Sequence, residues 1–286
     1  MLRSMYAGIS GMKNFQTKLD VIGNNIANVN TSGFKKGRVT FQEMMAQTTS
    51  GAQGPTNTRG GINPAQVGLG SQLGSIDNIQ TQGFRQTTNN PLDFALEGDG
   101  MFVVASDLQP VLTDSDVSYT RAGNFYLDES GDIVNPQGLY LIGFEVDPNG
   151  EPVLNPDNSY RYTTITIPTD AQSFNVQSNG VVNYIDADGD TGIAGRVALA
   201  NFANPAGLLK DGSNHFLASE NSGTPQFVVP ESEGVASVIS GSLEMSNVDL
   251  AEEFTEMITA QRGFQANTRI ITTSDEILQE LVNLKR

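Results

Sequence analysis

Few side chains in this sequence are spaced as a catalytic site would require. The single histidine, His215, follows Asp211-Gly-Ser-Asn, a turn-forming sequence without a recognisable Ser or Cys nucleophile motif. This context favours a structural or surface role for the imidazole. The chain has no cysteine, which excludes disulfides, thiolate catalysis and cysteine-bound zinc. We therefore expect no catalytic residue and no enzymatic activity.

Two Gly/Asp-rich segments could in principle bind a ligand. Residues 186–190, Asp-Ala-Asp-Gly-Asp, resemble the opening of a calcium loop, but Thr191 stands where the loop needs Gly and Val197 where it needs Glu. An acidic hairpin turn is favoured. Residues 98–100, Gly-Asp-Gly, precede a strand pattern rather than a helix, which excludes a phosphate-binding loop. We predict neither a metal site nor a cofactor.

The clearest pattern lies at the two ends of the chain, residues 2–28 and 249–286. Both read as amphipathic helices with apolar residues at alternating steps of three and four, the spacing of coiled coils. The N-terminal stripe consists of Leu2, Met5, Ile9, Met12, Leu19 and Ile26. The C-terminal stripe consists of Leu250, Phe254, Met257, Phe264, Ile271, Leu278 and Val282. Neither helix can bury its stripe alone, so the two helices are predicted to pair and to pack against other copies.

The final helix has a clear beginning and one unusual residue. Asp249 stands at the N-cap position, and Glu252 and Glu253 follow in the first turn. Their negative charges interact favourably with the positive end of the helix dipole. Gly263 in its middle costs about 0.8–1.0 kcal/mol relative to Ala in an exposed helix. A closely packed neighbouring helix would offset that cost.

Charge is distributed unevenly along the 286 residues, whose net charge is −16. Residues 1–60 carry a net +5, residues 61–248 a net −18 and residues 249–286 a net −3. The opposite signs of the two ends favour pairing of the terminal helices. The acidic middle makes nucleic acid an unsuitable partner. No stretch is apolar and long enough for membrane insertion, and we expect the first helix to be retained rather than cleaved as a signal.

The middle of the chain has the short apolar runs and turn signals of an all-β domain. Hairpins are predicted around residues 98–100, 128–131 and 177–180. Residues 48–75 lack periodic structure, and a short helix is predicted at 42–47. The predicted fold class is α+β: N- and C-terminal helices paired as a coiled-coil-like stalk, an extended arm and a central all-β domain.

Four segments follow from these patterns. They are residues 1–30, the N-terminal half of an inner helical domain; 31–72, an extended linker or arm; 73–245, a β-rich outer domain with a short insertion near 145–162; and 246–286, the C-terminal half of the inner helical domain. Terminal helices under a β-rich body favour a filament subunit over the alternative of a secreted calcium-binding or adhesive β-module.

Two motifs resemble one protein family. The run Asn24-Asn-Ile-Ala-Asn28-Val-Asn-Thr31-Ser-Gly33-Phe34-Lys35 is similar to the signature of bacterial flagellar rod and hook proteins. The runs 246–254 and 260–267 are similar to the closing motif of the same family. The resemblance implies export through the flagellar type III apparatus and assembly into a helical homopolymer. It also implies that Asn28, Thr31, Gly33 and Phe34 join the two apolar stripes in the assembly interface.

Within the family, residues 63–70, 138–144 and 198–205 most resemble a compact hook protein. The resemblance implies a curved tubular joint that transmits motor torque, located outside the cell on the hook. Its partners would be the distal rod, hook cap and hook–filament junction proteins. The chain departs from larger hook proteins in length, because only residues 145–162 stand where those proteins insert an outer domain. A distal rod protein of the basal body is the alternative.

Overall fold

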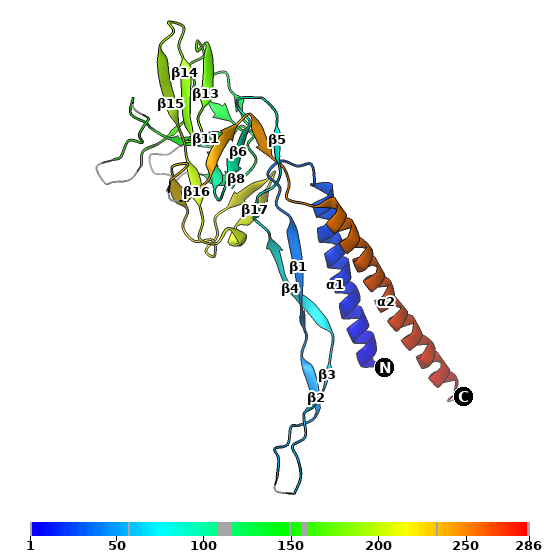
Figure 1. The fold of residues 1–286 in the computed structure, drawn as a ribbon. Helices are drawn as coiled ribbons and strands as arrows, with labels where there is room; N and C mark the ends of the chain where they lie inside the picture. Colours follow the sequence, from blue (N-terminus) through cyan, green and yellow to red (C-terminus); the bar gives the residue numbers. More distant parts are fainter. Residues whose placement is uncertain are drawn as a thin grey trace. The chain divides into compact units, whose positions relative to one another are not determined.

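The computed structural model describes residues 2–56, 58–107, 116–148, 150–155, 160–232 and 234–284, and the side chain of Leu2 is not described. The chain forms two compact units, each built from separate stretches of sequence. Helices lie at both ends of the chain and strands fill the middle (Figure 1). The predicted α+β class, with terminal helices and a mostly β body, is confirmed.

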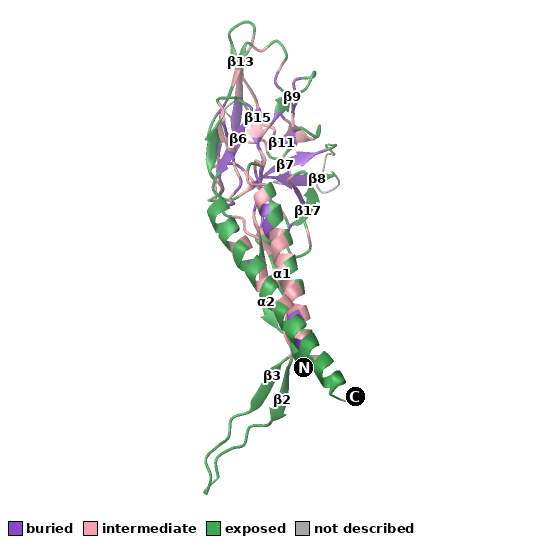
Figure 2. Cartoon of the chain, turned by 90° about the vertical axis from the view of Figure 1, so that its right-hand side faces the viewer, coloured by how far each residue is buried: buried purple, intermediate pink, exposed green. Residues whose placement is uncertain are grey.

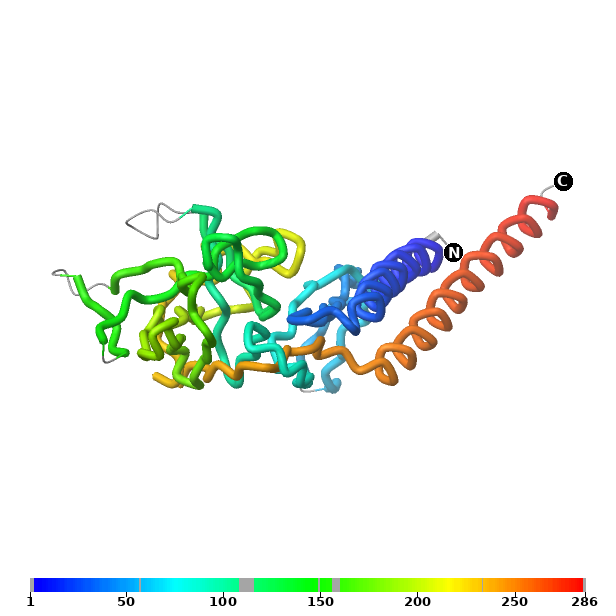
Figure 3. The backbone as a smooth tube through the Cα atoms, turned by 90° about the horizontal axis from the view of Figure 1, so that it is seen from above, coloured from blue at the N-terminus to red at the C-terminus, as the bar shows by residue number. Residues whose placement is uncertain are grey.

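The first unit comprises Met1–Ala27, Gly37–Ile79 and Val248–Arg286. Its elements are α1 (Leu2–Ala27), β1 (Gly37–Glu43), β2 (Ala46–Ser50), β3 (Ala65–Gly68), β4 (Ser71–Asn78) and α2 (Leu250–Asn283). The two helices lie side by side and antiparallel, because Gly8 of α1 lies at Ile271 and Phe15 lies at Gly263 (Figures 1 and 3). Asp249 caps α2 as predicted, its side chain accepting from the N–H groups of Ala251 and Glu252.

Residues 37–78 form a long two-stranded structure, called the ribbon below. β1 pairs antiparallel with β4 from Gly37↔Asn78 to Glu43↔Ser71, and β2 pairs with β3. The helix predicted at 42–47 is wrong, because β1 continues to Glu43 and β2 begins at Ala46. The prediction that 48–75 lacks regular structure is also wrong. Every residue of β2 and β3 is exposed (Figure 2), so no burial pattern marks these strands in the sequence.

The second unit comprises Asn28–Lys36 and Gln80–Asn247. Its largest sheet has 13 strands and the central order β13-β14-β15-β11-β7-β8-β18-β17, with β9, β10, β12, β16 and β19 branching from it. The strand bounds are β7 (Met101–Ala105), β8 (Val117–Thr120), β9 (Tyr126–Leu127), β10 (Ile133–Val134), β11 (Tyr140–Phe144), β12 (Tyr162–Thr164), β13 (Ser173–Val176), β14 (Val181–Ile185), β15 (Thr191–Val197), β16 (Leu199–Asn201), β17 (Leu209–Gly212), β18 (His215–Leu217) and β19 (Gln226–Val228).

Two smaller strand pairs complete this unit. β20 (Ser237–Ser240) pairs with β6 (Phe94–Glu97), and β21 (Ser242–Glu244) pairs with β5 (Arg85–Thr87). One 3-10 turn, η2, covers Pro205–Gly207. Of the insertion predicted near 145–162, residues 149 and 156–159 lie outside the described residues. Its remaining residues make isolated bridges, Val146↔Pro152 and Leu154↔Tyr160.

Two of the three predicted hairpins are confirmed. β9 pairs with β10 across residues 128–131, and β13 pairs with β14 across 177–180. The hairpin around 98–100 is wrong although both of its strands exist. Gly98 and Gly100 have φ values of 123° and 141°, which L side chains rarely adopt, and they turn the chain so that β6 pairs with β20 and β7 with β8.

The core of the second unit is centred on three phenylalanines from different segments, Phe94, Phe102 and Phe125. All three are fully buried, and the ring centroids of Phe102 and Phe125 are 5.4 Å apart in an edge-on arrangement. Such aromatic pairs add about 0.5–1.5 kcal/mol beyond the area that they bury. Buried residues concentrate in the strands of this unit (Figure 2). The second unit therefore has a core of its own.

Candidate assembly surface

α1 and α2 approach closely where α1 carries small residues. A Cβ on Gly8 would lie 3.3 Å from Cγ1 of Ile271, and a Cβ on Gly11 would lie 3.0 Å from the side-chain amide of Asn267. Gly263 is matched by Phe15, whose ring would lie 2.5 Å from a Cβ at that position. The close neighbour expected to offset the cost of Gly263 is therefore present.

Polar contacts fix the register of the same helix pair. The side-chain amide of Asn25 donates to Oε2 of Glu253 over 3.2 Å, and both residues are buried. Lys18 and Glu256 form an ion pair at 3.1 Å that is partly exposed. A partly exposed pair is worth about 0.2–1 kcal/mol, so the buried contact is the stronger register mark.

A neighbouring face of α1, about 100° around the helix axis, packs on the ribbon. The Asn14 side chain donates to Oγ of Ser71 over 2.8 Å, and Oγ of Ser10 would lie 2.3 Å from a Cβ on Gly70. Because Gly70 has a φ of 123°, a side chain there would be strained as well as crowded. α1 therefore contacts α2 on one side and the ribbon on another.

One member of the predicted N-terminal stripe reaches α2, because Oγ1 of Thr268 donates to Sδ of Met12 over 3.8 Å. The other α1 residues that contact α2 include Gly8, Gly11, Phe15 and Asn25. Met5, Ile9, Met12, Leu19 and Ile26 are half-buried, and the side chain of Leu2 is outside the described residues. Glycines of α1 provide the close approach to α2, and a count of apolar residues omits glycine.

The predicted α2 stripe divides into two groups. Met257, Phe264, Ile271 and Leu278 are half-buried, whereas Leu250, Phe254 and Val282 are 40%, 48% and 66% exposed. Sequence reasoning missed four further exposed aliphatic residues of this helix: Ile258, Ile270, Ile277 and Leu281. Large apolar side chains thus remain in contact with solvent along the whole of α2.

These exposed side chains form two flanks of α2. Flank A consists of Leu250, Phe254 and Ile258, which recur every four residues. Flank B consists of Ile270, Ile277, Leu281 and Leu284. At 3.6 residues per turn the two flanks lie roughly 150° apart around the helix axis. Contiguous exposed apolar surface of this kind marks an interaction site.

The ribbon also carries unpaired apolar residues. Phe41, Met45, Val67, Leu73 and Ile76 are each at least 39% exposed, and Met45 reaches 80%. A two-stranded ribbon is at best marginally stable in water by itself. Packing on α1 stabilises the end of the ribbon formed by β1 and β4, whereas β2 and β3 are exposed along their whole length.

The signature residues that follow α1 are packed inside the second unit. Asn28 and Thr31 are half-buried and hydrogen-bonded to each other, whereas Gly33 and Phe34 are buried. Gly33 has a φ of 69°, and a Cβ there would lie 2.5 Å from the backbone nitrogen of Ala122. Packing within the chain explains why Gly and Phe stand at these two positions.

A buried ion network lies directly beside this turn. Nζ of Lys35 lies 2.7 Å from Oε1 of Glu244, and Nε of Arg121 lies 2.6 Å from Oε2 of the same carboxylate. The N–H group of Gly83 also donates to Oε1 of Glu244 over 2.9 Å. Three segments distant in sequence are thereby joined at one side chain, which sequence reasoning did not identify.

The ion network shifts the pKa of both ends of the Lys35–Glu244 pair. Burial lowers the pKa of Lys35, and the opposing effect of Glu244 is the smaller one. Burial alone would raise the pKa of Glu244, but Arg121 and Lys35 together hold it below its usual value. The two cationic neighbours thus favour the charged form of the Glu244 carboxylate against the effect of its burial.

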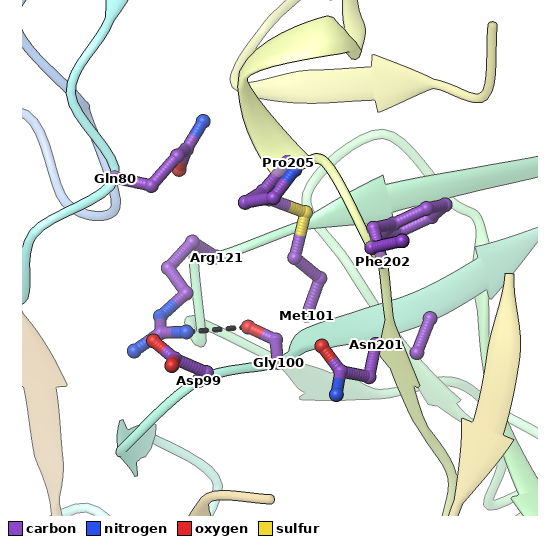
Figure 4. Close-up of a pocket in the computed structure, with 10 residues that line it drawn as sticks. Gln80, Asp99, Gly100, Met101, Arg121, Asn201, Phe202 and Pro205 are labelled. Carbon is purple, nitrogen blue, oxygen red and sulfur yellow. Dashed lines mark hydrogen bonds between the residues drawn. The ribbon is translucent and has the colours of Figure 1, made fainter. Parts of the chain in front are cut away.

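A small pocket of about 360 Å³ opens next to the guanidinium of Arg121 (Figure 4). Arg121 donates to the carbonyl of Gly100 in this pocket and to the carbonyl of Gly98 over 2.6 Å. Gln80, Asp99 and Asn201 supply further polar groups, and Met101 also lines the pocket. The guanidinium is thus already engaged by carbonyl oxygens and by Glu244.

The ligand-like segments of the sequence have structural explanations. Residues 186–190 form the turn between β14 and β15, where the N–H group of Asp186 donates to the carbonyl of Asp190 over 2.9 Å. His215 is buried, with Ser118 at 3.3 Å and Asn135 at 3.2 Å from its ring nitrogens. Among the described residues, no three His, Asp or Glu side chains gather as a metal site would require. In the same part of the chain, neither helix combines the length and apolarity needed to cross a membrane.

Three family profiles match this sequence. The profile described as "Flagella basal body rod protein" covers residues 5–35, "Flagellar hook protein FlgE/F/G D1 domain" covers 95–184, and "Flagellar basal body rod FlgEFG protein C-terminal" covers 239–284. The three matches fall on α1 with the signature turn, on part of the second unit and on β21 with α2.

Individual relatives match over their full length. The chain is 54% identical to flagellar basal-body rod protein FlgG of Bacillus subtilis and 37% identical to FlgG of Borreliella burgdorferi, each over 100% of both chains. It is 31% identical to flagellar hook protein FlgE of Borreliella burgdorferi, again over 100% of both, but that alignment extends over 448 positions instead of 287.

Proposed function

Because this chain belongs to the family of flagellar rod and hook proteins, we propose that it is a subunit of the flagellar basal-body rod that polymerises with copies of itself. A member of this family is a structural protein of the flagellum and not an enzyme. The observation that supports the rod in particular is the 54% identity to a rod protein along the entire chain.

The rod replaces the hook as the preferred function. The sequence motifs favoured a compact hook protein, with the distal rod as alternative, because the two share their terminal segments. The hook relative aligns over 448 positions and the rod relatives over 287 and 289, against 286 residues in this chain. Hook relatives thus contain a long stretch that this chain lacks, which supports the alternative. The hook cap and hook–filament junction proteins belong to the hook interpretation and are not proposed as partners.

The exposed apolar surfaces of the first unit are the proposed contacts between subunits. α1 and α2 together act as a coiled-coil-like stalk, and flanks A and B of α2 would each be covered by a neighbouring copy. Since the flanks lie roughly 150° apart, one neighbour cannot cover both. The ribbon, exposed along β2 and β3, would rest on further subunits.

Export would precede assembly in this proposal. A chain passing unfolded through the flagellar type III apparatus must delay helix pairing until it reaches the growing end. Helices that are marginal alone and stable when packed fit this order of events. The absence of cysteine keeps such a chain free of mispaired disulfides on the way.

Deleting the gene in the bacterium that makes this protein distinguishes a rod subunit from a hook subunit. Loss of a rod subunit removes the structure on which the hook is built, so the remaining basal bodies should lack both the distal rod and the hook in electron micrographs. Restoring the full chain should restore both. Basal bodies that keep a complete rod and lack only the hook would contradict the rod assignment and support the hook.

A further inference from the structure

A groove of about 630 Å³ lies between the N-terminal half of α1 and the ribbon. This α1–ribbon groove is lined chiefly by Arg3, Tyr6, Ile9, Lys13, Met44 and Leu73. Its volume equals that of roughly twenty water molecules, which is room for several aliphatic side chains. Ser71, whose Oγ accepts a hydrogen bond from the Asn14 side chain, forms part of the lining. The groove therefore lies on the face of α1 that contacts the ribbon.

The groove is apolar inside and cationic at its edges. Tyr6 is 68% exposed, Met44 38% and Leu73 39%, so water contacts apolar side chains along its length. Within the described residues, no carboxylate pairs with Arg3 or Lys13. A segment that fills the groove should therefore present aliphatic side chains flanked by acidic ones.

The last turns of α2 have that composition. The contacts of Gly8 with Ile271 and of Gly11 with Asn267 set the helix register. Extended to the start of α1, this register leaves residues 278–284, called the α2 overhang, beyond the end of α1 (Figures 1 and 3).

Leu281, Val282 and Leu284 of the overhang are 50%, 66% and 82% exposed. Glu280 lies within the overhang and Glu276 two residues before it, and both are exposed. The overhang and the turn before it thus combine exposed aliphatic side chains with two exposed carboxylates.

We propose that the α1–ribbon groove of one subunit receives the α2 overhang of a second copy, with Glu276 and Glu280 facing Arg3 and Lys13. The inference rests on the proposed function and deepens it by naming two surfaces that meet. The overhang of the same chain is not the occupant, because α2 packs on the Gly8–Gly11 face of α1 and the groove lies on the ribbon face.

The two surfaces differ, so their contact is head-to-tail. A head-to-tail contact repeats from subunit to subunit and produces a ring or an open helical polymer instead of a closed dimer. The geometry therefore gives one contact from which an axial polymer can grow. Leu281 and Leu284 lie about 60° apart around the helix axis, and burying them would contribute about 1.5–3 kcal/mol each before the costs of association.

Disulfide trapping tests this contact, and the cysteine-free chain makes any trapped bond unambiguous. Two full-length variants, Leu73→Cys and Leu281→Cys, are produced together in the native bacterium in place of the natural protein. Each carries one thiol, so a disulfide joins two different chains. Isolated axial structures are oxidised and their peptides analysed by mass spectrometry. The matched control pairs Leu73→Cys with Gln265→Cys, an exposed position of α2 outside the overhang.

We expect the 73–281 peptide to exceed the 73–265 peptide at least tenfold. Assembled structures in which the two are equally abundant would overturn the groove contact while leaving the rod proposal intact. Failure of the unmodified protein to enter axial structures would instead overturn the proposed function.

Charge reversal provides a test without cysteine. Arg3→Glu with Lys13→Glu should reduce swimming at least tenfold, and adding Glu276→Lys with Glu280→Lys should restore it. Lack of restoration by the fourfold variant would count against the groove contact even if the cysteine variants do not assemble.

Discussion

The ring of Phe15 fills the space beside Gly263, where a Cβ would lie 2.5 Å from its Cζ atom. This pair joins the middle of α1 to the middle of α2, so it determines how closely the two terminal helices approach. Any side chain at residue 263 must displace the ring or separate the helices.

Gly263→Ala is therefore expected to weaken the helix pair. Overpacking costs about 1–3 kcal/mol, which outweighs the gain of about 0.8–1.0 kcal/mol in helix propensity. Thermal unfolding followed by circular dichroism at 222 nm should show a lower midpoint. Gly23→Ala is the matched control, because no atom lies within 4 Å of a Cβ at residue 23. That variant should be stabilised, and a rise in midpoint for both variants would contradict the close contact.

Glu244→Gln is expected to destabilise the second unit strongly. The substitution leaves Lys35 and Arg121 buried without their carboxylate, and breaking a buried ion pair costs about 3–5 kcal/mol. Urea unfolding should reveal the loss as a lower midpoint. Glu145→Gln removes an exposed partner of Arg161 in the same unit and should change stability by less than about 1 kcal/mol. Equal effects of the two substitutions would refute the importance of the network.

The same carboxylate predicts a pH dependence. Because its folded-state pKa lies below the usual value, Glu244 contributes stability that is fully present above the unfolded-state pKa and is lost as pH falls through the folded-state pKa. The stability difference between the natural protein and Glu244→Gln should thus shrink as pH is lowered below about 4.3. Urea titrations at a series of pH values measure this difference. A gap that stays constant into strong acid would show that the carboxylate is not held ionised.

Asp249→Ala is expected to loosen the first turn of α2. The carboxylate accepts from the N–H groups of Ala251 and Glu252, and loss of such a cap costs about 0.5–2 kcal/mol. Amide hydrogen exchange at residues 251–253 should accelerate. Asp249→Asn retains an acceptor and should exchange nearly as slowly as the natural protein, so similar acceleration in both variants would exclude capping as the cause.

Ile258→Ser is expected to impair assembly of the subunits without impairing folding of the single subunit. Ile258 is 59% exposed on flank A, so the subunit should change in stability by less than about 0.5 kcal/mol, whereas swimming motility should be lost. Gln265→Ser, also exposed on α2, should leave both properties unchanged. Normal swimming by the Ile258→Ser strain would remove flank A from the assembly surface.

The sequence predicted those features that leave a local pattern. The terminal helices, the Asp249 cap and the need for a close neighbour at Gly263 follow from helix periodicity and propensity. The two confirmed hairpins follow from turn residues between alternating strands. The signature around Gly33 was recognised, but its burial in the second unit depends on contacts with residues near 122 and 244, which no local pattern reveals.

The errors have physical causes as well. β2 and β3 are exposed on both faces, so polar residues and glycines replaced the alternation that marks a strand. β6 and β7 read as a hairpin because a Gly-Asp-Gly turn joins them, yet β6 finds its partner in β20, far along the chain. The hook and rod functions share the terminal segments, and only overall length and full-length similarity distinguish them.

Immunogold electron microscopy of isolated hook–basal bodies tests the central proposal most directly. An antibody raised against residues 80–247 recognises the second unit and not the terminal helices. We predict label on the straight rod and none along the curved hook. Label distributed along the hook would contradict the rod assignment and establish the chain as a hook subunit.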